Sequence, residues 1–358
     1  MRWARGGLMA AYALVLGLVV ASALLAFGAA SGAPKAAEPT AAAIPEPAAT
    51  PLRKAGALKL PSRPPSGFRT LPPGEATGMI EATGDGLRLP RITPSGWMPW
   101  IANSRRFDPS GPPARVGLLM IDVGASEPLM QRAIEELPSE VSLAFLPGTP
   151  DLPRWLRQAR EHGHESYLML PVEDSAGPAE RGLKPIVTSA DTAENLRRLR
   201  AAMARGEGYV GFVIRSPGPV QQSEATVRPL IKEIADRGLA VIEINPPPET
   251  TVLHRLTAEL GTGYARSTNI LDYRLANDGV AGSLDRLVAW TGESGPDRRP
   301  RHAFGVMQPD SEAIDAVVAW HRRQAVPKTV SLVPIIGHFE CREVCMARLG
   351  AQPAQLRP

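Results

Sequence analysis

Short apolar segments alternate with longer amphipathic segments from residue 116 to residue 334. The short segments are apolar along most of their length, which is typical of parallel strands covered on both faces. We expect strands at Val116–Ile121, Val141–Leu146, Ser166–Leu170, Tyr209–Ile214, Ala240–Ile244, Gly263–Arg266, His302–Val306 and Val330–Pro334.

The segments between these strands have helical periodicity. We expect helices at Glu127–Leu137, Leu152–His162, Thr192–Ala204, Glu224–Arg237, Thr251–Leu260, Leu284–Thr291 and Glu312–Gln324. The alternation predicts an α/β fold, a distorted or incomplete (β/α) barrel of about seven to eight strands. A doubly wound open sheet is the alternative. The first strand is followed by Asp122–Ser126 and not by a glycine-rich dinucleotide fingerprint, which argues against a nicotinamide or flavin enzyme.

The N-terminal segment, residues 1–30, has the character of a signal anchor or transmembrane helix. Two arginines precede an uncharged apolar run from Leu8 to Ala30, and its length could span a bilayer. Small residues near its end leave a cleaved signal peptide as the alternative. Either way we expect an exported protein, anchored in the inner membrane and facing the periplasm, or periplasmic after cleavage.

Residues 31–96 are expected to form a disordered Pro/Ala-rich linker. Of the 37 prolines, 16 lie between residues 31 and 113, a concentration that indicates a spacer. The barrel is then expected at residues 97–340, followed by a C-terminal tail at residues 341–358. The Trp and Phe residues between Trp97 and Phe107 predict a lead-in segment that packs onto the barrel.

The formal net charge is +4, and aromatic residues make up 5% of the chain. No basic stripe is interleaved with aromatic residues, so nucleic acid is not an expected partner.

Several charged residues stand where strands end. In barrels of this kind the chemistry occurs at the carboxyl ends of the strands, and reading these ends gives Asp122, Glu173, Arg215 and Glu243. Of the six histidines, only His338 has a position from which it could return to this rim. A zinc site is therefore not expected. Carboxylates alone could hold a hard cation such as Mg²⁺, but no pattern specifies one.

Cys341 and Cys345 are the two cysteines of the chain, and they follow His338. In an exported protein they could form a disulfide, remain free thiols or, less expectedly, bind a metal.

Several short segments of the sequence resemble motifs of the divergent polysaccharide deacetylase family. They are Pro99-Trp100 to Phe107-Asp108, Ile121-Asp122, Ser142 to Pro147, Gly163-His164-Glu165 and Leu170 to Glu173. The resemblance covers about Pro99 to Pro334 and implies a distorted barrel related to carbohydrate esterases. It also implies a glycan partner and metal-assisted hydrolysis of an N- or O-acetyl group.

The sequence departs from the family pattern at positions that would bind metal or move protons. Val123 replaces the second of two aspartates, and Met169 replaces a histidine. Val213 to Gly218 replaces Asn-Asn-His-Met-Gly-Ser, and Gly305 to Gln308 replaces Gly-His-Pro-His. Glu243 occupies the position of an aspartate in the family pattern, and Ile244-Asn245 follows it where the family has Ser-Arg.

Two functions follow from these departures. The first is a degenerate, non-catalytic envelope protein that binds a glycan or acts as a scaffold, in which Arg215 fills the place of the metal and neutralises Asp122 or Glu173. The second is an active deacetylase with an altered centre. There Asp122 would be the base or sole metal carboxylate, Glu173 and Glu243 would assist, and Arg215 would stabilise an oxyanion. The first hypothesis needs no cofactor, and a divalent metal is possible under the second.

Overall fold

The structure is a computed structural model, and it describes residues 78–94, 96–106, 114–173, 182–272, 278–293, 302–324 and 330–340. The chain divides into two compact units, residues 1–51 and 52–358, and all described residues belong to the second. The expected N-terminal anchor, most of the expected linker, and Cys341 and Cys345 lie outside the described residues. Within the described ranges, no helix has the length and apolarity needed to cross a membrane.

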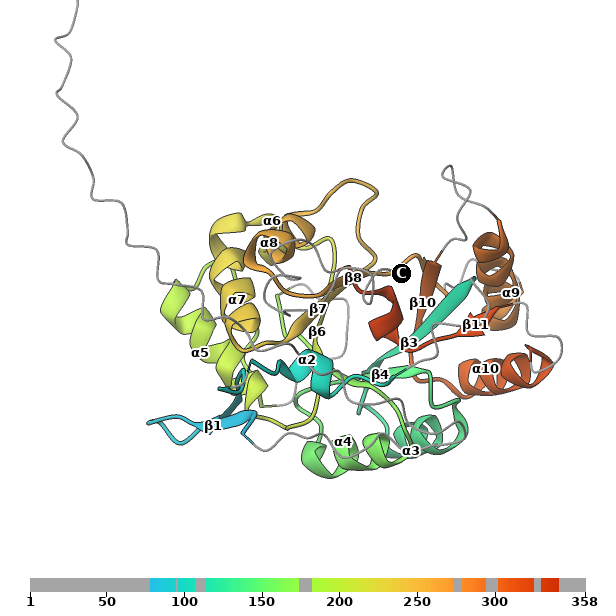
Figure 1. Cartoon of the computed structure of the whole chain (residues 1–358), viewed down its shortest axis with the longest axis horizontal. Coiled ribbons are helices and arrows are strands. Elements are labelled where there is room, and N and C mark those ends of the chain that lie inside the picture. Colours follow the sequence, from blue (N-terminus) through green and yellow to red (C-terminus); the bar gives the residue numbers. More distant parts are fainter. Residues whose placement is uncertain are drawn as a thin grey trace, which may run out of the picture. The chain divides into compact units, whose positions relative to one another are not determined.

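A curled parallel β-sheet forms the centre of the described unit (Figure 1). Its strands follow the order β8-β7-β6-β5-β4-β3-β10-β9. Strand β11 pairs with Arg115 and Val116 at the start of β3, before the part of β3 that pairs with β4. The bounds are β3 Arg115–Val123, β4 Ser142–Phe145, β5 Ser166–Met169, β6 Gly211–Arg215, β7 Ala240–Ile244, β8 Tyr264–Arg266, β9 Asn269–Ile270, β10 His302–Met307 and β11 Ser331–Leu332. Because β8 and β9 stand at the two ends of this order, the barrel is incomplete, which confirms the predicted fold class.

Helices follow most strands and pack against the outer face of the sheet (Figure 1). Their bounds are α3 Glu127–Glu136, α4 Leu152–Glu161, α5 Thr192–Met203, α6 Pro219–Gln222, α7 Glu224–Asp236, α8 Val252–Leu260, α9 Gly279–Gly292 and α10 Ser311–Gln324. N-cap side chains stabilise the start of several of these helices. Asp191, Ser223 and Thr251 each accept a hydrogen bond from a backbone N–H of the first turn, which is the usual N-cap arrangement.

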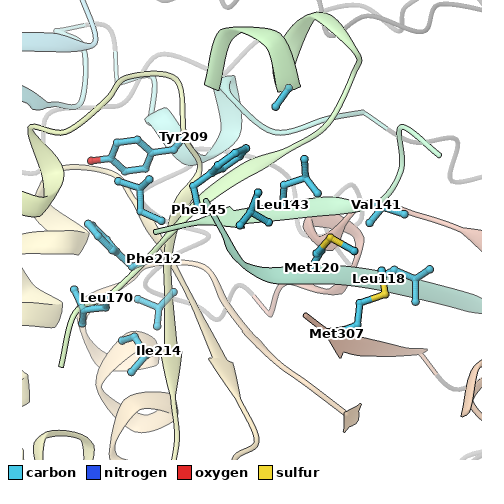
Figure 2. Packing of buried hydrophobic residues seen from close by; sticks show 14 of the residues in the cluster. Leu118, Met120, Val141, Leu143, Phe145, Leu170, Tyr209, Phe212, Ile214 and Met307 are labelled. Carbon is cyan, nitrogen blue, oxygen red and sulfur yellow. The ribbon is translucent and has the colours of Figure 1, made fainter. Parts of the chain in front are cut away.

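Alternate residues of each strand face two separate hydrophobic clusters. In β3, Leu118 and Met120 belong to the outer cluster, between sheet and helices. Figure 2 shows this outer cluster continuing across β4 to β6, where Phe145 and Phe212 lie among its side chains. Leu119 and Ile121 face the inner cluster, which fills the barrel. Because both faces of the strands are buried, the strand sequences do not alternate between apolar and polar residues.

A small antiparallel sheet precedes the barrel, within the range assigned to the linker by the sequence. It pairs β1 (Ile80–Ala82) with β2 (Arg88–Pro90), and Leu89 is buried in the outer cluster. Arg237, directly after α7, secures it by donating hydrogen bonds to Glu81 and to the carbonyl of Pro90. The lead-in helix α2 (Pro99–Ala102) follows, and Trp100 is buried in the inner cluster, as expected for a segment packing onto the barrel.

The last described segment spans the opening of the sheet. Its 3₁₀ helix η1 (Ile335–His338) contacts β3 and β10, and Ile335 and Phe339 join the inner cluster. Glu340 then exchanges backbone hydrogen bonds of 2.7 and 3.1 Å with Tyr264 of β8. This segment therefore links β8, at one end of the sheet, to β3 and β10 on the other side of the opening.

A fully buried carboxylate, Glu165, joins several of these segments. It accepts hydrogen bonds from the backbone N–H of Arg105 (2.9 Å), from Ser142 (3.0 Å) and Tyr167 (3.0 Å), and from the N–H of Ile336 (3.3 Å). Burial raises the pKa of Glu165 to about 7 against the opposing effect of these four donors. Glu165 thus connects the lead-in segment, two strands and η1.

Candidate functional site

The carboxyl end of β3 is distorted at Asp122. Met120 pairs with Leu143 and Val123 with Phe145, so β3 has one residue more than β4 in this interval, which defines a β-bulge. Asp122 has a φ of 58°, in the left-handed region that Asp tolerates better than most residues. The extra residue returns Val123 to the outer cluster and leaves Asp122 at the end of the barrel.

Gly124 allows the chain to turn immediately after this bulge. Its φ is 124°, and a Cβ on this residue would lie 1.9 Å from Oγ1 of Thr149. Thr149 is buried and held by a 2.7 Å hydrogen bond to the carbonyl of Leu146. The β3–α3 turn therefore requires glycine at this position.

Arg215, at the end of β6, forms an ion pair with Asp122. A guanidinium nitrogen donates to Oδ2 of Asp122, and Nε2 of Gln308 donates to the same oxygen at 3.4 Å. The side chains of Asp122 and Arg215 are 3% and 17% exposed. Gln221 of α6 donates to the backbone carbonyl of Arg215 and so fixes the end of β6.

A pocket of about 290 Å³ is lined by Arg215 and Gln308, the two residues that donate to Asp122. Its apolar surface comes from aliphatic residues, three of which belong to the inner cluster, so the floor of the pocket is the top of the barrel core. Polar groups from several strand ends surround this floor. The lining residues are Ile121, Glu173, Arg215, Ser216, Pro217, Gly218, Gln221, Ile244, Asn245, Ile270, Asp272, Val306 and Gln308.

Glu173 follows β5 and lines the pocket with Arg215. Its Oε1 accepts hydrogen bonds of 2.6 Å from both the backbone N–H and the hydroxyl of Thr188. One carboxylate oxygen is therefore held by the protein, and the second is turned away from these donors. Glu173 and Arg215 line one pocket, and Asp122 is linked to that pocket through its ion pair with Arg215.

Glu243, in contrast, does not line the pocket. In β7 the side chain of Ile244 faces the inner side, so Glu243 points to the outer face, where it is fully buried. Its Oε2 accepts 2.6 Å hydrogen bonds from Thr251 and Tyr264. The expectation that Glu243 assists at the cleft is therefore corrected. It is a buried structural acceptor between β7, α8 and β8.

His338 also lies away from this pocket. Its ring is beside Phe304, with 5.7 Å between the ring centroids, and its Nε2 would contact a side chain at Gly117, which glycine avoids. Enclosure there, with the nearby charges of His302 and Arg115 acting in the same direction, lowers the pKa of His338 to about 3. The possibility that His338 returns to the rim is corrected by this position.

The residues around Asp122 do not fit the catalytic metal that the family resemblance implies. The only carboxylate at the end of β3 is occupied by a guanidinium, and the described lining residues include no histidine. Across the described part of the chain, no group of three or more His, Cys, Asp or Glu side chains is placed to hold a metal ion.

Two lining residues were not recognised from the sequence. Asp272 follows β9, a strand of two residues that is too short to give a periodic signal, and its Oδ2 accepts a 2.8 Å bond from the N–H of Gln308. Gln221 lies on α6, a helix of four residues after Pro217-Gly218. Neither residue directly follows a predicted strand end, so no pattern in the sequence indicated them.

The sequence profile of the divergent polysaccharide deacetylase family matches residues 118–336. The match spans more than half of the chain, and the chain belongs to this family. No curated protein matches the sequence.

One solved structure supports the same fold. An uncharacterized protein of Agrobacterium tumefaciens is similar with a TM-score of 0.60 and 24% sequence identity, over 70% of this chain and 98% of that protein. A putative cellobiose-phosphate cleavage protein of Enterococcus faecalis is more distant, with a TM-score of 0.42 and 12% identity over 63% of this chain and 98% of that one.

Proposed function

We propose that this chain is a degenerate, non-catalytic member of its family that binds a glycan in the pocket lined by Arg215 and Gln308. The ion pair between Arg215 and Asp122 carries the proposal. A carboxylate that accepts from a guanidinium and an amide has its charge neutralised, and is a poor metal ligand or general base. The strand framework that shapes the pocket is retained, which favours continued use of the cleft for binding.

Family membership supports a carbohydrate as the ligand. The pocket combines an aliphatic floor with polar groups at its edge, which is the usual construction of a small-molecule site. Its volume suits about one sugar residue of a longer chain, because it lies near the lower end of the range for ligand pockets.

Two assays on the purified full-length protein test this proposal. In the first, co-sedimentation with insoluble peptidoglycan and exopolysaccharide should retain the protein, and soluble glycan should release it. In the second, acetylated amino-sugar oligomers are incubated with the protein and Mg²⁺, Mn²⁺, Zn²⁺ or Co²⁺, and no acetate should form. Acetate release with multiple turnovers would instead establish the alternative, an active deacetylase with an altered centre. Retention on no glycan would leave only a scaffold role.

We also propose that the protein is exported and acts in the cell envelope. The apolar N-terminal run, with its two preceding arginines, supports this location. Protease added to spheroplasts should degrade the barrel while cytoplasmic proteins remain intact, and protection of the barrel would contradict export.

A further inference from the structure

The polar lining of the pocket at Arg215 and Gln308 consists largely of hydrogen-bond acceptors. Gln221 lines the pocket, is 5% exposed, and has an Oε1 with no hydrogen-bond partner among the described residues. Its Nε2 is already used by the carbonyl of Arg215, so the free atom is the acceptor. Oδ1 of Asp122 is a second buried acceptor without a described partner, but Asp122 itself does not line the pocket. A buried acceptor without a donor is costly, so the amide oxygen of Gln221, which lines the pocket, favours a ligand that supplies donors.

Two carboxylates at the edge of the pocket add to this pattern. Thr188 holds one oxygen of Glu173, and the N–H of Gln308 holds one oxygen of Asp272. Each carboxylate is thereby fixed in orientation while its second oxygen has no described hydrogen bond. These two groups present acceptors without a conformational cost on binding.

The charge of the described lining is negative. Arg215 is its single cation, and that cation is paired with Asp122. The carboxylates of Glu173 and Asp272 remain without a cationic partner among the described residues. A ligand with its own carboxylate or phosphate would meet both acids, whereas a ligand with an ammonium group would be attracted to them.

We infer that the pocket selects sugars with a free amine, such as glucosamine units, over acetylated and anionic sugars. This inference rests on the proposed glycan-binding function and adds the chemical class of the ligand. The ammonium group and ring hydroxyls supply the donors that Gln221, Glu173 and Asp272 lack. The aliphatic floor formed by Ile121, Ile244 and Val306 would contact the C–H face of the ring.

The test is calorimetric titration of the full-length protein with three tetramers of similar size: glucosamine, N-acetylglucosamine and galacturonate. Titrations are made below the pH at which the sugar amine titrates. Glucosamine should bind at least about fivefold more tightly than the acetylated tetramer, and galacturonate should bind most weakly. The advantage of the amine should decrease with added salt and at a pH above its titration.

The variant Glu173→Gln/Asp272→Asn preserves the anchoring bonds, because each amide keeps a carbonyl for Thr188 or Gln308, but it replaces the free acceptors with donors. Glucosamine affinity should fall about tenfold, and affinity for the acetylated tetramer should change little. The matched control Glu135→Gln/Asp285→Asn changes exposed acids of α3 and α9 that do not line the pocket, and should bind like the parent protein.

The results distinguish a failure of the amine selection from a failure of glycan binding itself. Equal affinity for the amine and acetylated tetramers would overturn the selection for amines and leave glycan binding intact. Tightest binding of galacturonate would also overturn it. Binding of none of the three tetramers at millimolar concentration would overturn both the inference and the proposed function.

Discussion

Arg215 lies at the end of β6 and donates to the carboxylate of Asp122 at the end of β3, two strands that are not neighbours in the sheet. The ion pair therefore crosses the mouth of the barrel. The resemblance to the family implies a metal-binding carboxylate at the position of Asp122 and a histidine at the position of Arg215. The energetics of the ion pair can be measured directly.

Replacing Arg215 alone should be strongly destabilising. The variant Arg215→Met leaves the charge of Asp122 buried and unpaired, which typically costs about 3 kcal/mol of unfolding free energy. The double variant Asp122→Asn/Arg215→Met should recover most of this loss, because neither charge remains. Urea unfolding of the four proteins in the cycle gives the coupling energy. As a control, Arg228→Met removes partly exposed ion pairs with Glu224 and Glu259 and should cost below about 1 kcal/mol. Additive losses would mean that the pair is not formed.

Glu165 should make stability fall as the pH rises through the slightly acidic range. Its pKa in the folded protein is about 7, above the value of 4.5 expected for the unfolded chain, so the folded state binds the extra proton between these values. The stabilisation is complete below about pH 4.5 and is lost up to about pH 7, at no more than about 1.4 kcal/mol per pH unit. The difference between the parent and Glu165→Gln in urea unfolding at several pH values isolates this slope. Parallel curves would show that Glu165 is ionised throughout.

His338 should contribute the opposite dependence. Its pKa of about 3 lies below the unfolded value of 6.5, so the unfolded state binds the extra proton. The contribution is complete above about pH 6.5 and decreases as the pH falls, by up to about 1.4 kcal/mol per unit. Stability of His338→Leu should therefore decline less than that of the parent between pH 6.5 and pH 5. An equal decline in both proteins would place a charged imidazole beside Phe304.

Gly124→Ala should destabilise the protein by about 1–3 kcal/mol, because a side chain there combines an unfavourable φ with a collision against Thr149. Gly84 provides the control. It is exposed, and a Cβ on it would meet no atom within 4 Å, so Gly84→Ala should change the unfolding free energy by less than about 0.5 kcal/mol. Equal effects of the two substitutions in thermal unfolding would contradict the close approach of the β3–α3 turn to Thr149.

The framework of the barrel could be predicted because its strands are continuous apolar runs and its helices have a strong period. The range predicted for β7, for example, agrees with the structure at both ends. The pairing of Arg215 with Asp122 was also accessible, since the ends of parallel strands meet at one edge.

Other features depend on geometry that a sequence pattern does not carry. Glu243 stands one position before the inward-facing Ile244, and a shift of one residue along a strand moves a side chain to the opposite face. In β3, the extra residue of the bulge at Asp122 shifts the alternation by one position, so that Val123 faces the outer cluster. The hairpin of β1 and β2 has strands of three residues, and its order comes from Leu89 and Arg237, which are far apart in the sequence.

Saturation-transfer NMR on partially acetylated glucosamine oligomers tests the central claim most directly, because one sample reports both binding and loss of acetyl groups. The account predicts transfer from the full-length protein to the sugar protons, reduced in Glu173→Gln/Asp272→Asn, with an acetyl methyl signal that stays constant in the presence of divalent metals. Growth of a free acetate signal would contradict a non-catalytic role, and the absence of transfer would contradict glycan binding.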